Sequence, residues 1–258
     1  MFLVMKDEKR EITLLALGDG VSTAKLGSGK EASSILRKNI IEAFKEKASL
    51  LKDEISIKEF CSKVIAKSNI DIIESIKTKV DITKETPSGI MATTLILAVI
   101  VRNKMYYTSI GDSRLFIYSE KDGLNLLNYE DNVMNLKLAN GMAWDKVVNS
   151  EGRYAITRYI GGGSFKDGNL YPREFTISIH CLDLEPGQII IICSDGVTDY
   201  INKSYYDDDL WKVTESLEKI IKENKEKSLD VLNNKIITEA NLNGGGDNIT
   251  IITSKVLK

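Results

Sequence analysis

Four aspartates stand where apolar runs of this sequence stop or begin. Each is followed by glycine, serine or asparagine: Asp19-Gly20 after LLALG, Asp112-Ser113 after YYTSIG, Asp195-Gly196 after IIIICS, and Asp247-Asn248 before ITIIT. An unpaired carboxylate at the end of a buried strand is costly, because it loses its hydration. Carboxylates that gather from several strand ends therefore need a shared cation.

Oxygen ligands of this kind suit hard divalent ions such as Mg²⁺ and Mn²⁺. Such an ion offsets the repulsion between carboxylates, and a glycine beside an aspartate leaves its own carbonyl accessible as a further ligand. The single histidine, His180, and the three scattered cysteines argue against a zinc site of nitrogen and sulfur ligands. Each aspartate on its own also fits a turn or a helix cap. Spacing alone does not decide between turns and a metal site.

The elements that would position these aspartates follow from the apolar periodicity. Strands are predicted at 11–18, 93–119, 175–195 and 248–256, and helical blocks at 28–80 and 214–241. The first block divides into two amphipathic helices, at 28–51 and 56–80, whereas 214–241 is predicted to be one long helix.

Hairpin signals link most of the strands. Turns are predicted at Arg102–Lys104 and Lys121–Gly123, so that 93–119 forms an antiparallel meander. The runs 175–182 and 188–194 are expected to pair with each other across LEPG. Strands joined by hairpins favour an α/β protein with layered, mostly antiparallel sheets over a doubly wound parallel sheet.

Composition places the chain among ordinary globular proteins. Its 258 residues are 43% hydrophobic and 28% charged, and the formal net charge of -2 gives no electrostatic case for nucleic acid. No apolar run reaches the roughly 20 residues that span a bilayer, and the start is too short for a signal peptide. Three cysteines without a CxxC pair are typical of reduced thiols. We expect one domain over residues 1–258, no nucleic-acid or membrane partner, and a cytoplasmic location.

Five segments, in this order, resemble the motifs of the metal-dependent serine/threonine protein phosphatases of type 2C, in a bacterial form. They are ALGDGVSTAKLGSGKEAS, ATTLILAVIVRNKMYYTSIGDSRLFIY, the flap-like segment 126–162, IIIICSDGVTDYI and GGGDNITIITSKV. Each motif alone is weakly specific, but all five in the family's order cover nearly the whole chain. The resemblance implies an α/β fold, a layered sandwich of two mostly antiparallel β-sheets flanked by α-helices.

The resemblance also implies a set of metal ligands. They are the carboxylates of Asp19, Asp112, Asp195, Asp199 and Asp247 and the carbonyl of Gly20. Of these, Asp19 would bridge two ions of Mn²⁺ or Mg²⁺, and Asp195 and Asp247 would complete the catalytic set. Asp112 and Asp199 would serve a third, weaker metal position.

The reaction implied by the resemblance needs no cysteine. A water activated by the metal pair would hydrolyse phosphoserine or phosphothreonine in a phosphorylated protein, without a phosphoenzyme. A cognate serine/threonine kinase is the partner that such an activity implies. The long flap at 128–160 suits a protein substrate better than a small molecule, although a small-molecule phosphohydrolase stays open as an alternative.

The start of the chain departs from the family pattern. The family has an upstream segment with a phosphate-binding arginine and an acidic metal ligand, and here only MFLVMKDEKREI precedes the Asp19 strand. We interpret Asp7, Glu8 and Arg10 as a solvated hairpin turn. Either the N-terminal segment is short or truncated, or the protein is a weakened or inactive member that acts as a binding module. Lys25, in the loop after Asp19, is a candidate for holding phosphate in place of the arginine.

Overall fold

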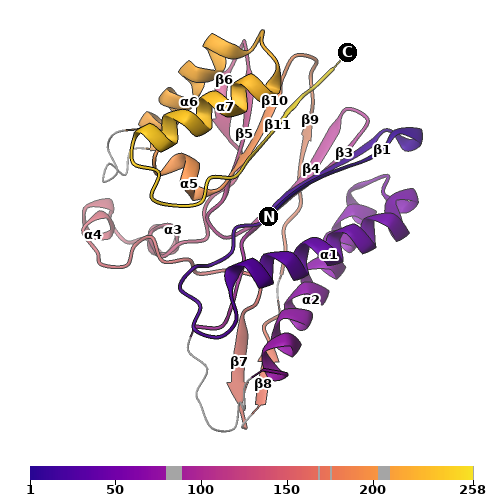
Figure 1. The fold of residues 1–258 in the computed structure, drawn as a ribbon, viewed down its shortest axis with the longest axis vertical. Helices are drawn as coiled ribbons and strands as arrows, with labels where there is room; N and C mark the ends of the chain where they lie inside the picture. Colours follow the sequence, from indigo (N-terminus) through magenta and orange to yellow (C-terminus); the bar gives the residue numbers. More distant parts are fainter. Residues whose placement is uncertain (80–88, 168, 175, 203–209, 258) are drawn as a thin grey trace. The chain divides into compact units, whose positions relative to one another are not determined.

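The computed structural model describes residues 1–79, 89–167, 169–174, 176–202 and 210–257 (Figure 1). Contacts within the chain divide it into two units: unit 1 comprises Met1–Gly111 and Arg158–Asp183, and unit 2 comprises Asp112–Thr157 and Leu184–Lys258. Each unit is built from two separate stretches of chain and contains one large antiparallel sheet. In the described part, no helix combines the length and the hydropathy needed to span a bilayer.

Unit 1 is built on a five-stranded antiparallel sheet. In spatial order its strands are β1 (Phe2–Asp7), β2 (Ile12–Leu17), β3 (Leu95–Val101), β4 (Lys104–Ile110) and β9 (His180–Asp183). The helices are α1 (Gly29–Lys47) and α2 (Glu54–Lys77), with short turns η1 (Glu8–Arg10) and η2 (Ala48–Leu50). A small hairpin of β7 (Gly163–Lys166) and β8 (Asn169–Pro172) packs against α2. The predicted pair of helices and the β3–β4 hairpin are confirmed, while residue 80 lies outside the described residues.

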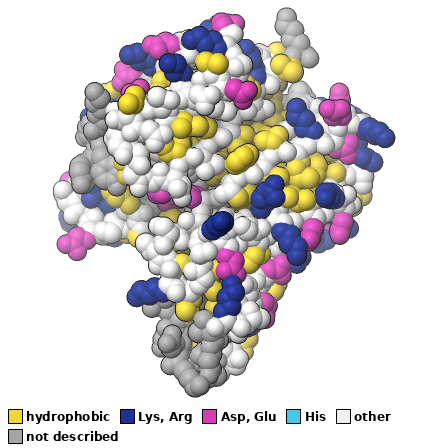
Figure 2. Space-filling model, in the orientation of Figure 1, with side chains coloured by type: hydrophobic (Ala, Val, Ile, Leu, Met, Phe, Trp, Pro, Cys, Tyr) yellow, Lys and Arg dark blue, Asp and Glu magenta, His cyan; other side chains and the backbone are white. Residues whose placement is uncertain are grey.

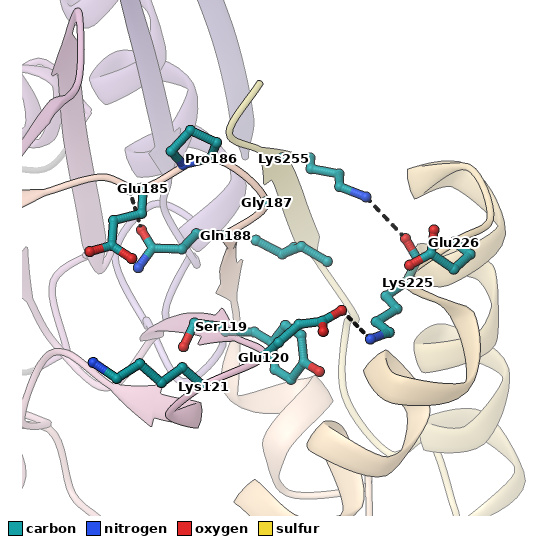
Figure 3. A pocket seen from close by; sticks show the side chains of 12 residues that line it. Ser119, Glu120, Lys121, Glu185, Pro186, Gly187, Gln188, Lys225, Glu226 and Lys255 are labelled. Atoms are coloured by element: carbon teal, nitrogen blue, oxygen red, sulfur yellow. Dashed lines mark hydrogen bonds and ion pairs between the residues drawn. The ribbon is translucent and has the colours of Figure 1, made fainter. Parts of the chain in front are cut away.

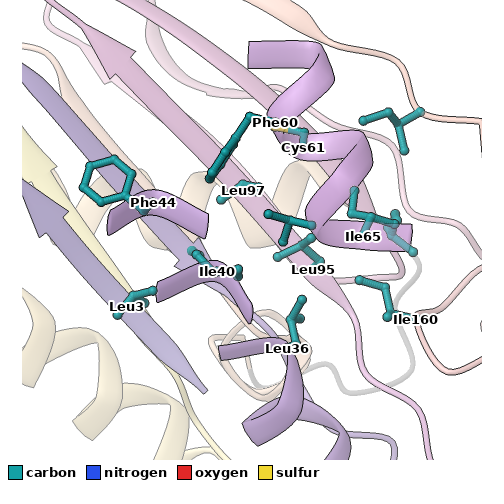
Figure 4. Close-up of a cluster of buried hydrophobic side chains, with 14 of the residues drawn as sticks. Leu3, Leu36, Ile40, Phe44, Phe60, Cys61, Ile65, Leu95, Leu97 and Ile160 are labelled. Atoms are coloured by element: carbon teal, nitrogen blue, oxygen red, sulfur yellow. The ribbon is translucent and has the colours of Figure 1, made fainter. Parts of the chain in front are cut away.

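The core of unit 1 forms where the apolar stripes of the two helices meet the sheet (Figure 4). Leu36 and Ile40 of α1 and Ile65 of α2 are buried in one cluster with Leu95 and Leu97 of β3. The four-residue spacing of Leu36 and Ile40 places both on the same face of α1. Burying each such side chain stabilises the fold by about 1.5–3 kcal/mol.

Unit 2 is built on a four-stranded antiparallel sheet. In spatial order its strands are β11 (Ile251–Lys255), β10 (Ile189–Cys193), β5 (Arg114–Ser119) and β6 (Gly123–Leu126). The helices are α3 (Val133–Ala139), α4 (Trp144–Val148), α5 (Asp195–Thr198), α6 (Leu210–Asn224) and α7 (Leu229–Leu242). β10 lies between β5 and β11, and all five of its residues are buried, which explains its unbroken apolar sequence.

The predicted meander over 93–119 is wrong, because β4 and β5 belong to different sheets. β3 pairs with β4 in unit 1, whereas β5 pairs with β6 and β10 in unit 2. The chain changes sheet at Gly111, whose φ of 101° lies in the region that favours glycine.

Two further predictions about the second half of the chain are wrong. The runs 175–182 and 188–194 do not pair: β9 pairs with β4, and β10 pairs with β5 and β11. Alternation and turn residues indicate a strand but not its partner, and residue 175 lies outside the described residues. The helix expected at 214–241 is two helices, because Ser228 caps α7 by accepting a hydrogen bond from the Val231 N–H at 3.4 Å.

The hairpin of β1 and β2 leads to Asp19. Arg10 donates to the Asp7 carboxylate at 2.6 Å within its turn, which agrees with the interpretation of this segment as a solvated turn. The turn stands at the start of β2, and Asp19 follows the end of that strand. Six residues of strand span about 20 Å. Asp7 therefore lies too far from Asp19 to share a metal ion with it, and Arg10 lies too far to bind a phosphate held there.

Charged side chains are interspersed on the face of the molecule in Figure 2. Lysines and arginines alternate there with aspartates and glutamates, and no broad area carries a single sign. Proteins that bind a nucleic-acid backbone gather their cations into a patch or stripe. This face offers no such patch.

Candidate metal centre

The loop that carries Asp19 is held by two threonines just before β3. The Asp19 N–H donates to Thr94 Oγ1 at 2.9 Å, and the Thr94 N–H donates to the Asp19 carbonyl at 2.7 Å. The hydroxyl of Thr93 donates to the same carbonyl at 2.8 Å. These bonds fix the backbone of Asp19, which is half-buried, directly after the end of β2.

Replacing Thr94 by valine should loosen the Asp19 loop. Valine keeps the shape of the buried side chain but removes the acceptor of the Asp19 N–H, which costs about 1–2 kcal/mol of unfolding free energy. Urea unfolding checks this, and a higher Mn²⁺ requirement for activity should accompany it. Thr108→Val, at a buried threonine in the middle of β4, is the matched control. Equal losses in the two variants would contradict a specific role for Thr94.

Gly20 lies against Gly29, the first residue of α1. A Cβ on Gly20 would lie 2.3 Å from the Gly29 carbonyl oxygen, and one on Gly29 would lie 2.4 Å from the carbonyl carbon of Gly20. Such distances leave no room for a side chain at either position. The helix begins at Gly29 because Ser28 accepts a hydrogen bond from the Glu31 N–H at 3.2 Å. This close contact holds the Asp19-Gly20 segment against the helix.

Three predicted ligands of unit 2 lie next to the same end of its sheet. Cys193, the last residue of β10, pairs with the first residues of β5 and β11. Asp195 follows β10, whereas Asp112 and Asp247 precede the two neighbouring strands. Antiparallel pairing therefore brings the three aspartates to one end of the sheet.

The segments around Asp195 and Asp247 are held side by side. The Ser194 N–H donates to the Thr250 carbonyl at 3.0 Å, and the Thr250 N–H donates back to Ser194 Oγ at 3.1 Å. A Cβ on Gly196 would lie only 2.3 Å from the carbonyl oxygen of the residue after Asp247. Two segments that are far apart in the sequence, each carrying a predicted ligand, are thus side by side in the fold.

Asp199 joins this acidic region from the end of α5. Its N–H donates to the Asp195 carbonyl at 2.8 Å, which places it one helical turn further on. Desolvation by the surrounding protein, together with the charges of Glu130 and Asp247, raises the pKa of the Asp199 carboxyl to about 6, and the charge of Arg114 opposes this rise. A bound divalent cation would relieve this repulsion between carboxylates.

The raised pKa of Asp199 predicts two effects of pH. A proton competes with the metal at this carboxylate, so Mn²⁺ affinity at its position should fall as the pH drops below about 6. In the metal-free protein, this raised pKa adds stability that is full below the ordinary carboxyl pKa of 3.8 and is lost as the pH rises through about 6. Asp199→Asn should therefore raise the Tm of metal-free protein at neutral pH but not in acid. Calorimetry at both values checks this, and an equal Tm change at both would contradict it.

The candidate ligands are oxygen atoms throughout. In the described part of the chain, no three side chains of histidine, cysteine, aspartate or glutamate stand together as a complete metal site. Burial raises the pKa of Cys61 and Cys193 to about 12, so neither supplies a thiolate near neutral pH. Mg²⁺ keeps several of its waters and needs few protein oxygens. The carboxylates at this end of the sheet therefore fit a hard divalent ion.

Not every predicted site residue belongs to this end of the sheet. Asp19 and Gly20 belong to unit 1, so a ligand set that includes them stays a prediction. Lys25 is exposed, and its N–H donates to the Gly89 carbonyl at 2.7 Å. Its role in holding phosphate also stays a prediction.

A cavity of about 390 Å³ lies at the other end of β10 (Figure 3). Gln188 and Ile189, at the start of β10, line it, and Lys225 pairs with Glu120 beside them. Asp195 follows the opposite end of the strand. The cavity is therefore separate from the candidate metal centre of unit 2.

Comparison with known proteins gives relatives over nearly the whole chain. A serine/threonine phosphatase named stp from Listeria innocua is 24% identical over 246 residues, covering 95% of this chain and 84% of the relative. A putative protein phosphatase 2C-type from Streptococcus pyogenes is 27% identical over 251 residues, covering 97% of this chain and 88% of the relative.

Solved structures share the fold. The serine/threonine phosphatase of S. agalactiae superposes with a TM-score of 0.73 at 20% identity, covering all of this chain and 92% of that one. The catalytic domain of the phosphatase PstP, in complex with two manganese ions, gives a TM-score of 0.69 at 18% identity, covering 100% of this chain and 91% of that one. These likenesses confirm the predicted fold of antiparallel sheets flanked by helices. The family model described as "Protein phosphatase 2C" matches residues 2–234. The chain therefore belongs to the protein phosphatase 2C family.

Proposed function

We propose that this chain is a metal-dependent protein phosphatase that hydrolyses phosphoserine and phosphothreonine. The observation that carries the proposal is the placement of Asp112, Asp195 and Asp247 at the same end of three neighbouring strands, in a chain of this family. Relatives are named serine/threonine phosphatases, and one structural neighbour holds two manganese ions. Dependence on a divalent metal follows from these likenesses. The choice of Mn²⁺ or Mg²⁺, and a count of two ions with a third, weaker position, belong to the proposal.

The chain's own part in the reaction is to hold the metal-binding side chains in place. Asp195 and Asp247 would hold one ion. Asp19 would contact both that ion and a second one, and the carbonyl of Gly20 would also hold the second. When bound, the metal pair supplies a water of lowered pKa and neutralises charge on the phosphoryl oxygens. Thr94 and Ser194 hold the backbone of the ligand loops by hydrogen bonds before any substrate arrives. Ligands fixed in advance cost no reorganisation during the reaction.

The partners and the domain organisation form part of the same proposal. The substrate is a phosphorylated protein, and a serine/threonine kinase of the same cytoplasm would supply it. We infer one phosphatase domain over residues 1–258, because the family match runs through both units.

The test uses p-nitrophenyl phosphate and a phosphothreonine peptide with Mn²⁺ or Mg²⁺, with and without EDTA. We expect turnover of both substrates that requires the ion and stops with the chelator. Turnover of small phosphates but of no phosphopeptide would favour a small-molecule phosphohydrolase. Absence of turnover with either ion would favour a binding module without activity.

A further inference from the structure

Arg114 and Glu130 form an ion pair beside the carboxylates of unit 2. The Nε of Arg114 donates to Oε1 of Glu130, and their side chains are 15% and 14% exposed. Removing either partner of an ion pair with so little hydration strongly destabilises the protein, because the other charge stays buried and unpaired. Neither residue is a predicted metal ligand, but Arg114 stands two positions after Asp112.

One hydrogen-bond donor of the Arg114 guanidinium, the buried Nη1 atom, has no acceptor among the described residues. Arg114 pairs with Cys193 at the end of β10, and its charge acts on the carboxylate of Asp199. A buried donor on a charged group strongly favours an acceptor.

Glu130 connects this guanidinium to helix α3. Its Oε2 accepts from Nδ2 of Asn132 at 2.7 Å, and its carbonyl accepts from Nδ2 of Asn135 at 3.0 Å. Asn132 is buried and caps α3 by accepting from the Asn135 N–H at 2.8 Å. The same side chains therefore fix Glu130 and the start of the helix.

Asn128 provides a second connection between residues 113–115 and residues 128–135. This buried side chain accepts from the Leu115 N–H at 2.7 Å and donates to the Ser113 carbonyl at 3.0 Å. Residues 113–115 and 128–135 are thus joined by hydrogen bonds at both Asn128 and Glu130. A displacement of α3 would be transmitted to the residues next to Asp112.

We propose that the Arg114–Glu130 pair is a positioning element that couples the start of helix α3 to the weaker metal position of unit 2. Glu130 fixes Arg114 at the start of β5, two residues after Asp112, and Asn132 connects Glu130 to the start of α3. Such coupling is reciprocal, so metal binding also shifts α3. The inference rests on the proposed function, because the weaker position is the one assigned there to Asp112 and Asp199.

The test measures Mg²⁺ binding by isothermal titration calorimetry. Arg114→Lys keeps the charge but loses the planar fork, and Glu130→Gln keeps the shape but loses the charge. We expect each to weaken the weakest Mg²⁺ site about 10–100-fold, as for other outer-shell partners of metal ligands, with the tighter sites and the circular dichroism unchanged. Glu120→Gln, which breaks the ion pair to Lys225 at the far end of β5, is the control and should bind like wild type.

A second readout follows the helix itself. Trp144 lies on α4, which packs against α3, so a Trp211→Phe background makes it the single tryptophan reporter. Mg²⁺ should change its emission in that background, and Arg114→Lys should abolish the change. Should Arg114→Lys and Glu130→Gln not fold, Asn132→Ser, which can still cap α3, decides by the same two readouts.

The outcomes separate the two proposals. Variants that bind Mg²⁺ within about twofold of wild type, with the Trp144 response intact, overturn the coupling alone. A wild-type chain that neither binds Mg²⁺ nor hydrolyses a phosphopeptide overturns the proposed function, and the coupling with it.

Discussion

Replacing Asp195 by asparagine is expected to lower kcat for a phosphopeptide by about 10³-fold or more. The substitution keeps the shape of the side chain but removes the charge that the metal pair needs, so the loss should exceed the roughly 10–100-fold cost of altering an outer-shell partner. The fold should persist, because the asparagine oxygen can still accept the Gly196 N–H that Asp195 accepts at 2.8 Å. Steady-state kinetics at saturating Mn²⁺, with circular dichroism alongside, measures both.

The matched control for this variant is Asp122→Asn. Asp122-Gly123 is the same dipeptide in the β5–β6 turn, where the carboxylate accepts from the Ser119 hydroxyl at 3.2 Å. We expect its kcat to stay within about twofold of wild type, as for surface substitutions away from a site. Full activity in Asp195→Asn, or an equal loss in the control, would contradict the assignment of Asp195.

Gly196→Ala should have the second large effect. The new Cβ would lie 2.3 Å from the carbonyl oxygen of Asn248 and 3.0 Å from its carbonyl carbon, so backbone must move. Overpacking of this kind costs about 1–3 kcal/mol. The movement separates the segments of Asp195 and Asp247, and Mn²⁺ affinity should therefore fall at least about tenfold. Urea unfolding and a Mn²⁺ titration measure the two effects.

Gly162→Ala provides the comparison, because a Cβ there would meet its nearest atom at an ordinary 3.5 Å. This variant should bind Mn²⁺ as the wild type does and unfold at nearly the same urea concentration. If Gly196→Ala bound Mn²⁺ as tightly as Gly162→Ala, the close approach of the two segments would have no part in holding the ion.

Much of the fold and the placement of the aspartates is predictable from sequence, because those features are local. The unbroken apolar run before Ser194-Asp195 indicates a buried strand that ends on a carboxylate, and β10 is that strand. The four-residue spacing of Leu36 and Ile40 indicates the inner face of α1. Such patterns depend only on residues that are neighbours along the chain, so they can be recognised without knowing the fold.

The features that sequence reasoning missed join residues that are distant along the chain. No local pattern assigns β5 to one sheet and β4 to another, since turn residues specify neither partner nor sheet. The bond between Thr94 and Asp19 is equally invisible, as is the pair of Arg114 and Glu130. The only signals were the paired threonines before β3 and the arginine after Asp112-Ser113, within segments that resemble the family's motifs.

The central claim is that Asp19, Asp195 and Asp247 together hold divalent ions. Anomalous scattering from a crystal of this protein soaked in Mn²⁺ tests it most directly. We predict two strong peaks within about 2.5 Å of these carboxylates, with Asp19 contacting both ions. Three carboxylates that point to separate places, or peaks bound only elsewhere on the protein, would contradict the claim.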